Sequence, residues 1–467
     1  MRTWNTDTNK FILVVLLTVI VLLVPTPVGL SENGKRALAA FVFAGSIFSL
    51  QPISLPFSSL MVSIVLVYLG VAETSQAFSA LSSPIIILIL GSLFMAEALR
   101  KKGLTRRLAF HAIILSEGNV NMLLLGVMLI AAFLSMWMEN TATAAVLIPV
   151  ALTIANQVPD KDAAKEVTLL LILGIAYSAS LGGMVTITGS ASNAVASAFL
   201  TTVIKWSFLD WARYGFAAFI AVFPSTWWIL SRIMNIKTKS LNIDVAQEEI
   251  RGMGNLKRSE WEVLLVLSIT AILWISGSSI ESSLGLDSQI LSPSVVAISA
   301  VIFLALRGVI VWEDVKGVSW GMFFVIGAGL SLGAALQRTG ATEWLAGYMS
   351  PIISNSNFLF AIVFLVFLSS GLTNIVNNAT VAAVFVPILI SIAEGNPELN
   401  AVQLVLPLTL ATTFGYALPS ASGRMALIYS TGLVKREDMI KYGVILTFTS
   451  SLILSILFYL MSMVGWI

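Results

Sequence analysis

Long apolar runs separated by short polar segments recur along the chain and predict a helical membrane protein. A bilayer span needs about 20 apolar residues, and fewer where a helix is broken inside protein. Before residue 231 such runs lie at 11–28, 37–50, 57–72, 84–99, 120–138, 141–155, 167–184 and 211–230. After residue 260 they lie at 261–276, 293–306, 321–336, 358–372, 376–393, 404–418 and 444–464, with a short broken or re-entrant piece at 423–433.

The composition agrees with a membrane protein. The 467 residues are 57% hydrophobic and 11% charged, whereas soluble domains carry about 25% charged residues. A net charge of +2 is too small to indicate binding to nucleic acid. The absence of cysteine excludes disulfides and thiolate metal sites, and the single histidine, His111, cannot build a zinc cluster.

A charged, polar segment at 231–260 separates a first half, 1–230, from a second half, 261–467. The first apolar run resembles the core of a signal peptide. However, Pro25 and Pro27 follow it in place of a small-residue cleavage site. We therefore predict an uncleaved first transmembrane helix.

Two polar motifs interrupt the apolar runs, one in each half. The first is Ser-Met-Trp-Met-Glu-Asn-Thr-Ala-Thr at 135–143, and the second is Thr-Asn-Ile-Val-Asn-Asn-Ala-Thr at 373–380. In each motif an asparagine, Asn140 or Asn378, precedes a proline by nine residues. Matching interruptions in two halves indicate a transporter's binding site. The alternative is that these side chains only hold packed helices together, but two occurrences in register favour a site.

The two halves repeat, and their loops indicate opposite orientations. Gly103 and Gly340 follow similar apolar segments and are 237 residues apart, while Asn140 and Asn378 are 238 apart. The loop at 100–107 has five basic residues and no acidic residue, whereas its counterpart at 337–343 has one of each sign.

The positive-inside rule places the basic loop in the cytoplasm and its counterpart outside, which makes the repeat inverted. The N-terminus, with Arg2 and Lys10, is then cytoplasmic as well. A parallel duplication whose loop charges have drifted is the alternative.

A second pair of polar stretches, rich in glycine and serine, lies at 177–193 and 412–424. At membrane depth an unwound helix must line a cavity or be buried in protein. Its carbonyl groups can bind cations, and the N-termini of adjacent helices can bind anions. Close helix packing is an equal explanation for Gly182 and Gly183.

These segments resemble the divalent anion/sodium symporter family, whose members carry dicarboxylates and sulfate. The motifs that carry the resemblance are 136–143, 175–184, 415–421 and 432–443. The resemblance implies an all-α polytopic protein of two inverted repeats with re-entrant hairpins, built as scaffold and transport domains. It implies a homodimer in the plasma membrane that works as an elevator.

The implied activity is secondary active transport, and not catalysis, of a small di- or tricarboxylate anion, above all a divalent C4-dicarboxylate such as succinate, malate or fumarate. The alternative is sodium-independent exchange of dicarboxylates and 2-oxoglutarate, or transport of sulfate. Na⁺ is the implied coupling ion, and no other cofactor is expected. The family's two sodium sites map onto Ser135, Glu139, Asn140 and Gly189, and onto Thr373, Val376, Asn378 and Ala421. The implied substrate site comprises Glu139, Asn140, Thr141, Ser190, Asn377, Asn378, Ala379, Ser422 and Arg424.

Two charged residues depart from the family pattern. Glu139 stands where the family has serine, and Arg424 ends a segment where the family has Thr-Pro-Pro. A charge inside the bilayer costs several kcal/mol unless it is paired, so both are candidate functional groups.

Three hypotheses follow for these charges. The two residues pair, and Arg424 replaces the charge of a sodium ion, which favours sodium-independent exchange or proton coupling. Alternatively, Glu139 is a sodium ligand and Arg424 contacts the anion by bidentate hydrogen bonds. In the third, Arg424 reaches out to an interface.

The remaining charged and aromatic residues suit structural roles, and the motifs that a channel or an enzyme would need are missing from the sequence. We expect Glu97 to form a local ion pair with the basic residues at 100–102, and four tryptophans to lie in an aromatic belt, namely Trp206, Trp211, Trp227 and Trp228. A channel would need a ring of repeated polar groups along one pore. An intramembrane hydrolase would need a nucleophile with its base, and no such motif appears at membrane depth.

Overall fold

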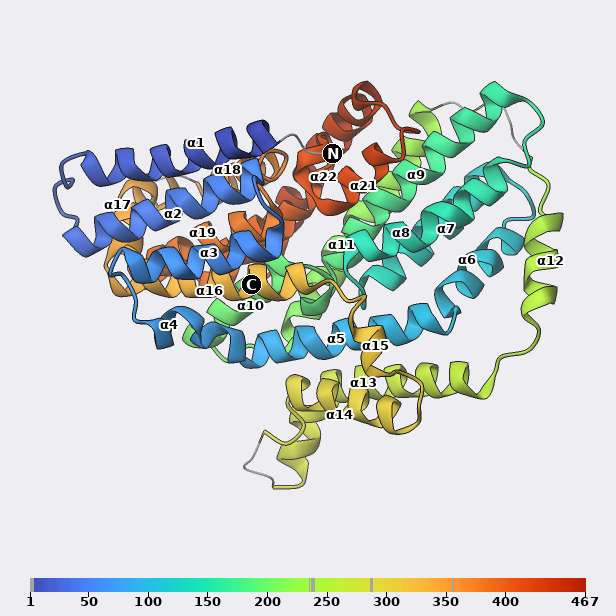
Figure 1. The fold of residues 1–467 in the computed structure, drawn as a ribbon, viewed down its shortest axis with the longest axis horizontal. Helices are drawn as coiled ribbons and strands as arrows, with labels where there is room; N and C mark the ends of the chain where they lie inside the picture. The colour runs from blue at the N-terminus through green and yellow to red at the C-terminus, as the bar shows by residue number, and fades with distance from the viewer. Residues whose placement is uncertain (1–3, 235, 237–239, 286–288, 355–356) are drawn as a thin grey trace.

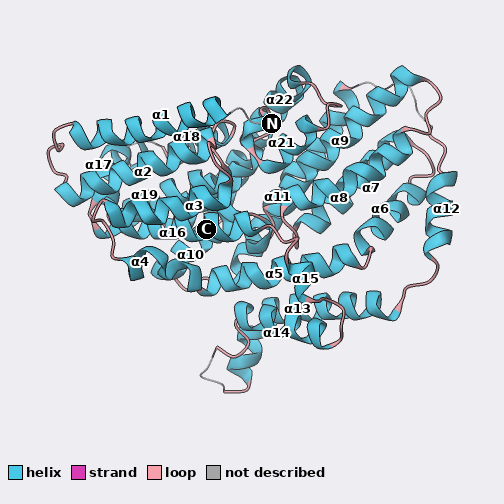
Figure 2. Ribbon diagram, in the orientation of Figure 1, coloured by secondary structure: helices cyan, strands magenta, loops and turns pink. Residues whose placement is uncertain are grey.

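The computed structural model describes residues 4–234, 236, 240–285, 289–354 and 357–467, which form helices joined by turns and short loops (Figures 1 and 2). Arg2 and part of the 231–260 segment lie outside the described residues. Within the described ranges, β structure is limited to one isolated bridge between Asn119 and Ser240.

The α-helices before residue 240 are α1 (Trp4–Leu23), α2 (Glu32–Leu50), α3 (Leu55–Tyr68), α4 (Thr74–Ser79), α5 (Pro84–Lys101), α6 (Leu104–Leu115), α7 (Val120–Ser135), α8 (Asn140–Ala155), α9 (Lys161–Gly183), α10 (Ala191–Val203) and α11 (Phe208–Ile233). Those that follow are α12 (Asp244–Met253), α13 (Arg258–Ser283), α14 (Pro293–Leu306), α15 (Trp312–Val315), α16 (Trp320–Arg338), α17 (Ala341–Ser354), α18 (Phe358–Thr373), α19 (Asn378–Glu394), α20 (Ala401–Ala411), α21 (Gly423–Ser430) and α22 (Arg436–Met463). Four 3₁₀ turns are η1 (Ala80–Ser82), η2 (Ile187–Gly189), η3 (Thr412–Phe414) and η4 (Pro419–Ala421).

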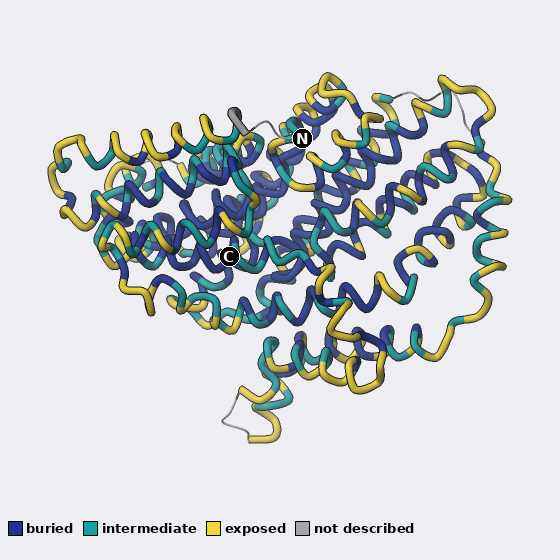
Figure 3. The backbone as a smooth tube through the Cα atoms, viewed as in Figure 1, coloured by how far each residue is buried: buried dark blue, intermediate teal, exposed yellow. Residues whose placement is uncertain are grey.

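Among the described helices, α9, α11, α13, α16 and α22 are long and apolar enough to cross a bilayer. The segments Thr74–Ser82 and Pro84–Lys101, bent by 47°, make a sixth candidate span. Helix α9 is central, because 89% of its most apolar window is buried, against 33% for α11 and α13. The tube in Figure 3 shows this distribution, with buried backbone inside and exposed apolar residues on outer helices such as α1.

Two helical hairpins enter the molecule from opposite ends and stop near its middle. Helices α7 and α8 extend from the right end of Figure 1, while α18 and α19 extend from the left end. Each of these helices has 16 or 17 residues, which is too short for a full span of about 20. The hairpins are therefore re-entrant and oppositely oriented, as the inverted repeat predicts.

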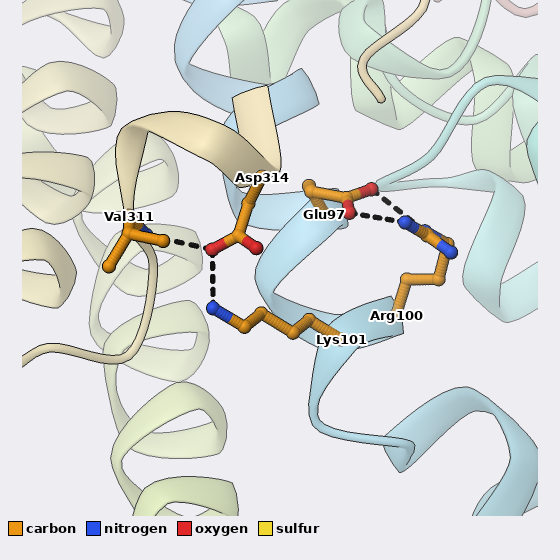
Figure 4. A network of polar contacts seen from close by, with 5 residues as sticks. All are labelled: Glu97, Arg100, Lys101, Val311 and Asp314. Atoms are coloured by element: carbon orange, nitrogen blue, oxygen red, sulfur yellow. Dashed lines mark hydrogen bonds and ion pairs between the residues drawn. The ribbon is translucent and has the colours of Figure 1, made fainter. Parts of the chain in front are cut away.

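The loop at 100–107 joins α5 to α6 on the right side of Figure 1, and this side of the molecule is called the basic end below. The predicted ion pair is present at this end, because Arg100 Nε donates a hydrogen bond to the Glu97 carboxylate at 2.8 Å. Lys101 pairs with Asp314 at 2.5 Å, and the backbone N–H of Val311 donates to the same carboxylate (Figure 4). The Glu97 prediction is confirmed, and the Lys101 contact additionally fastens α5 to α15.

The 231–260 segment is more ordered than a polar linker suggests. It contains α12 and the first turn of α13, and α12 packs beside α6. Arg107 of α6 is buried and donates to Glu260 at 3.2 Å, to Gly254 O at 2.7 Å and to Met253 O at 3.3 Å. The segment is thus packed against and hydrogen-bonded to α6, the helix that connects α5 to the first hairpin.

Candidate functional site

The tip of the first hairpin is built from the end of α7 and the start of α8. The Asn140 amide contacts the hydroxyl of Ser135, the last residue of α7. With its nitrogen turned toward α9, the amide donates to Ala179 O at 3.0 Å and to Gly189 O at 3.3 Å. Asn140 therefore joins the tip to the interrupted segment that follows α9.

Hydroxyl groups from that segment donate hydrogen bonds to a backbone carbonyl in the turn at the tip. Thr186 and Thr188 both donate to Met136 O, at 2.6 and 3.1 Å. Asn193 of α10 donates to Gly183 O and Thr186 O, at 2.9 and 2.8 Å. These bonds compensate for backbone groups that lose their partners where α9 unwinds inside the protein.

Two glycines allow backbone oxygens to gather beside Asn140. A Cβ on Gly189 would lie 2.5 Å from Gly183 O and 2.7 Å from Ser135 O. A Cβ on Gly183 would lie 2.4 Å from the Asn140 side-chain amide and 2.9 Å from Gly189 O. We call the carbonyl oxygens of Ser135, Gly183 and Gly189 the first oxygen cluster. Unwound carbonyls of this kind coordinate Na⁺ in transporters, so the residues present fit a sodium ion.

The tip of the second hairpin repeats this construction. The Thr373 hydroxyl contacts the Asn378 amide oxygen five residues later, as Ser135 contacts Asn140. It also lies 2.9 Å from Thr412 O. A Cβ on Gly415 would lie 3.1 Å from both Thr373 O and the Ala421 Cβ. The oxygens of Thr373, Asn378 and Thr412 beside Gly415 form the second oxygen cluster.

The remaining residues predicted at the second tip lie in or beside its turn. Asn377 caps α19 by accepting from Ala379 N at 2.9 Å. Val376 is half-buried, and its N–H donates to Leu372 O at 2.8 Å. Asn374 was not among the predicted site residues, yet its amide oxygen accepts from Ala417 N at 2.9 Å and so fixes the unwound segment.

Side-chain contacts join the two halves at this level. The hydroxyl of Thr412 donates to Ser192 at 2.9 Å, and Ser192 lies 2.9 Å from the Ser190 hydroxyl. Because Thr373 bonds to Thr412 O, a continuous polar chain leads from α10 to the second tip. Ser180 adds another link by donating to Thr413 O at 2.5 Å.

The start of α21 lies against the start of α8. A Cβ on Gly423 would be 2.6 Å from the Thr141 hydroxyl, which brings Ser422 and Thr141 together from opposite halves. Ser190 and Ser422 precede α10 and α21, and neither side chain caps its helix. The Ser422 hydroxyl is buried without a partner in the described structure. Two helix N-termini free of side-chain caps suit an anion.

Arg424 is fully enclosed in the protein, with 1% of its side chain exposed. Its Nη2 donates to Thr413 O at 3.1 Å and to Gly415 O at 3.2 Å, while Nε has no partner in the described structure. The hypothesis that Arg424 reaches an interface is therefore wrong, because the side chain turns inward onto the segment beside the second oxygen cluster.

The two unusual charges do not pair with each other in this structure. The ion pairs within 4.0 Å among the described residues include neither Glu139 nor Arg424. The Glu139 carboxylate instead accepts from the Thr141 hydroxyl at 2.6 Å. Glu139 thus stays at the half-buried entrance to α8, beside the first oxygen cluster.

Sequence reasoning missed the side chains that connect the halves, namely Ser180, Ser192 and Thr412. All three lie in the two Gly/Ser-rich stretches. The sequence therefore indicated the stretches, but it did not indicate which side chains in them form hydrogen bonds with each other. Their pairing depends on how α9, α10 and η3 pack, which no local pattern specifies.

The comparisons with known proteins cover nearly the whole chain. Residues 5–467 match the family model described as the sodium:sulfate symporter transmembrane region. An uncharacterized transporter of Haemophilus influenzae is 32% identical over 442 residues, which is 92% of each chain. The sodium-dependent dicarboxylate transporter SdcS of Staphylococcus saprophyticus is 26% identical over 95% of this chain and 89% of its own. Mouse solute carrier family 13 member 1 is 24% identical over 92% and 91%.

A solved structure shares the fold. The Alcanivorax borkumensis YdaH transporter, whose crystal structure is described as revealing an unusual topology, matches with a TM-score of 0.58. The match covers 99% of this chain and 97% of that one at 12% identity, so it speaks for the fold alone. The predicted all-α class and the family resemblance are both confirmed. The chain therefore belongs to the sodium:sulfate symporter family of transmembrane transporters.

Proposed function

We propose that this protein is a secondary active transporter of small divalent organic anions, with C4-dicarboxylates such as succinate, malate and fumarate as its substrates. The main support is that each of two mirror-related hairpin tips carries an oxygen cluster beside the uncapped start of α10 or α21, and that hydrogen bonds through Ser192 and Thr412 link α10 to the second tip. The substrate class follows the name of the SdcS relative. Because the relatives are named as transporters, we propose transport and not catalysis.

In this proposal the two oxygen clusters hold the coupling sodium ions, and the anion binds between them. Ser135, Glu139, Asn140 and Gly189 serve the first ion, and Thr373, Val376, Asn378 and Ala421 serve the second. The anion contacts the first turns of α8 and α19 and reaches Ser190, Ser422 and Arg424. Coupling requires that the fully loaded carrier crosses more readily than the partly loaded one.

The larger arrangement is also a proposal. The two hairpins and the broken helices move together as a transport domain against a scaffold, in an elevator motion within a homodimer. The chain divides into 1–230, a cytoplasmic linker at 231–260, and 261–467. The protein lies in the plasma membrane with its N-terminus and basic end in the cytoplasm.

Sodium-independent exchange is the second candidate, and one observation favours it. The guanidinium of Arg424 is buried without a carboxylate and donates to two carbonyls beside the second oxygen cluster. A fixed cation at this position could supply the charge of one sodium ion. Sulfate, which the family description names, is the alternative substrate.

Purified protein in liposomes separates these possibilities. Uptake of labelled succinate driven by an inward sodium gradient supports symport, and uptake that needs internal dicarboxylate but no sodium supports exchange. Labelled sulfate is measured in parallel. If neither anion accumulates by a saturable process with counterflow, the proposal is wrong. A Glu139→Gln variant with unchanged transport and cation dependence would remove Glu139 from the site.

A further inference from the structure

A cavity lies at the basic end, away from both hairpin tips. It has a volume of about 540 Å³ and is lined by the start of α7, Leu170 of α9 and the last two turns of α11. Volumes of about 300–1,000 Å³ are typical of small-molecule sites. The walls are joined where Trp227 Nε1 of α11 donates to Asn121 O of α7 at 3.2 Å. The cavity is therefore a defined space between two anchored helices.

One side of the cavity is polar and carries an unneutralised positive charge. Arg232 is exposed, and the described structure gives it no carboxylate within 4.0 Å and no side-chain hydrogen bond. Asn119 and Ser231 lie on the same lining, and the described part of that lining includes no carboxylate. The simpler explanation is that Arg232 only interacts with solvent and the C-terminal dipole of α11. That explanation leaves the adjoining cavity without a role.

The other side of the cavity is apolar and aromatic. Leu170 and Met122 line it, and Met122 is 51% exposed. Trp228 is 57% exposed although it is a large aromatic residue. Tryptophan prefers the boundary between lipid headgroups and hydrocarbon, so the cavity lies at headgroup depth. Its occupant should have an anionic part for Arg232 and an apolar part for the remaining wall.

We propose that this cavity binds an anionic glycerophospholipid of the cytoplasmic leaflet. The lipid phosphate pairs with Arg232, and the upper part of an acyl chain lies along Met122, Leu170 and Trp228. Basic pockets between transmembrane helices on the cytoplasmic side bind anionic lipid headgroups. The leaflet assignment depends on the proposed orientation, whereas the site and its ligand class do not depend on the transported substrate.

Native mass spectrometry of the purified full-length protein tests the proposal. The protein is exposed to phosphatidylglycerol or phosphatidylcholine of equal chain length, and the lipid retained per protomer is measured. We expect preferential retention of phosphatidylglycerol, and about a tenfold loss in an Arg232→Gln variant, because a charge-assisted bond is removed. Arg338→Gln, at the end of α16, is the matched control, because Arg338 is also exposed and has no carboxylate within 4.0 Å in the described structure, and it should retain lipid normally.

A second measurement separates a lipid from a soluble anion. Phosphatidylglycerol should raise the thermal stability of the wild-type protein, while millimolar inorganic phosphate or glycerol 3-phosphate should not. Stabilisation by phosphate alone would overturn the lipid assignment. Equal retention of the two lipids, or unchanged retention in the Arg232→Gln variant, would overturn the site itself. No readout is transport, so failure here leaves the proposed transport activity intact.

Discussion

Gly183 gives a direct test of the first oxygen cluster at the scale of a single residue. A Cβ there would lie 2.4 Å from the Asn140 side-chain amide and 2.9 Å from Gly189 O. Overpacking of this kind costs about 1–3 kcal/mol, so we expect Gly183→Ala to weaken sodium-stimulated uptake by about tenfold or more. Sodium titration of uptake in liposomes measures the effect.

The control for this substitution is Gly371→Ala near the end of α18. A Cβ at Gly371 meets no atom within 4 Å, so its sodium dependence should equal that of the wild type. Melting temperatures measured without sodium show whether Gly183→Ala still folds. A folded Gly183→Ala protein with wild-type sodium dependence would contradict a cation role for the first oxygen cluster.

Arg424 tests whether a fixed charge is needed beside the second oxygen cluster. Replacement by glutamine removes the charge and leaves the carbonyls of Thr413 and Gly415 without their guanidinium donor. Unsatisfied buried groups cost about 1–3 kcal/mol, so anion transport should fall by at least about tenfold in Arg424→Gln. Arg424→Lys keeps the charge but loses the planar fork and should retain more activity.

Transport and counterflow measured side by side in both variants provide the comparison. Equal loss in the two variants would show that the geometry of the guanidinium matters and its charge does not. Wild-type exchange in Arg424→Gln would exclude Arg424 from the site.

The residues at the tips could be predicted because the same motif occurs in both halves of the sequence. Asn140 and Asn378 repeat in register, and each contacts a hydroxyl five residues earlier. The direction of Arg424 could not be predicted, because an arginine near an apolar run suits an interface as well as an interior. Packing of Tyr177 and Tyr416 around the segment, with ring centroids 4.8 Å apart, depends on contacts between the halves.

At the scale of elements, the contact between α6 and the 231–260 segment can be tested through its buried ion pair. Arg107 and Glu260 form an ion pair with about 10% and 6% of their side chains exposed. Removing one partner of a buried pair typically costs about 3–5 kcal/mol, because the other charge stays buried and unpaired. We expect Arg107→Ala to lower the free energy of unfolding by this order, measured by chemical denaturation in detergent.

The neighbouring residue is the matched control. Arg106 pairs with Glu249 at 2.9 Å, but 53% and 33% of these side chains are exposed. Exposed pairs are worth about 0–1 kcal/mol, so Arg106→Ala should be nearly neutral. Similar losses in the two variants would show that burial of the Arg107 pair does not set its contribution.

The lengths of the apolar runs predicted the hairpin helices and most spans, but they did not predict two helices, α10 and α12. Helix α12 is amphipathic, with Ala246 buried and several charged residues outward, so its residues look like a polar linker. Helix α10 has only 13 residues and starts inside a Gly/Ser-rich stretch. It is helical because Asn193 and the adjacent hydroxyls satisfy the broken backbone around it.

At the scale of the whole molecule, the opposed hairpins require the two repeats to face opposite sides of the membrane. Lys102 follows α5 at the basic end, and Gln337 lies in the last turn of the corresponding helix α16 at the other end. Charge counting predicted this orientation from the five basic residues at 100–107. The structure places the two loops at opposite ends of the helical bundle (Figure 1).

The chain has no cysteine, so single-cysteine variants report this orientation without a background. We expect Gln337→Cys to react with a membrane-impermeant maleimide in intact cells, because the proposed orientation places its loop outside. Lys102→Cys should react only after the membrane is permeabilised. Both residues are at least partly exposed, so burial does not protect either thiol. Labelling of both variants in intact cells would contradict the inverted arrangement, and labelling of Lys102→Cys alone would reverse the proposed orientation while keeping the repeat inverted.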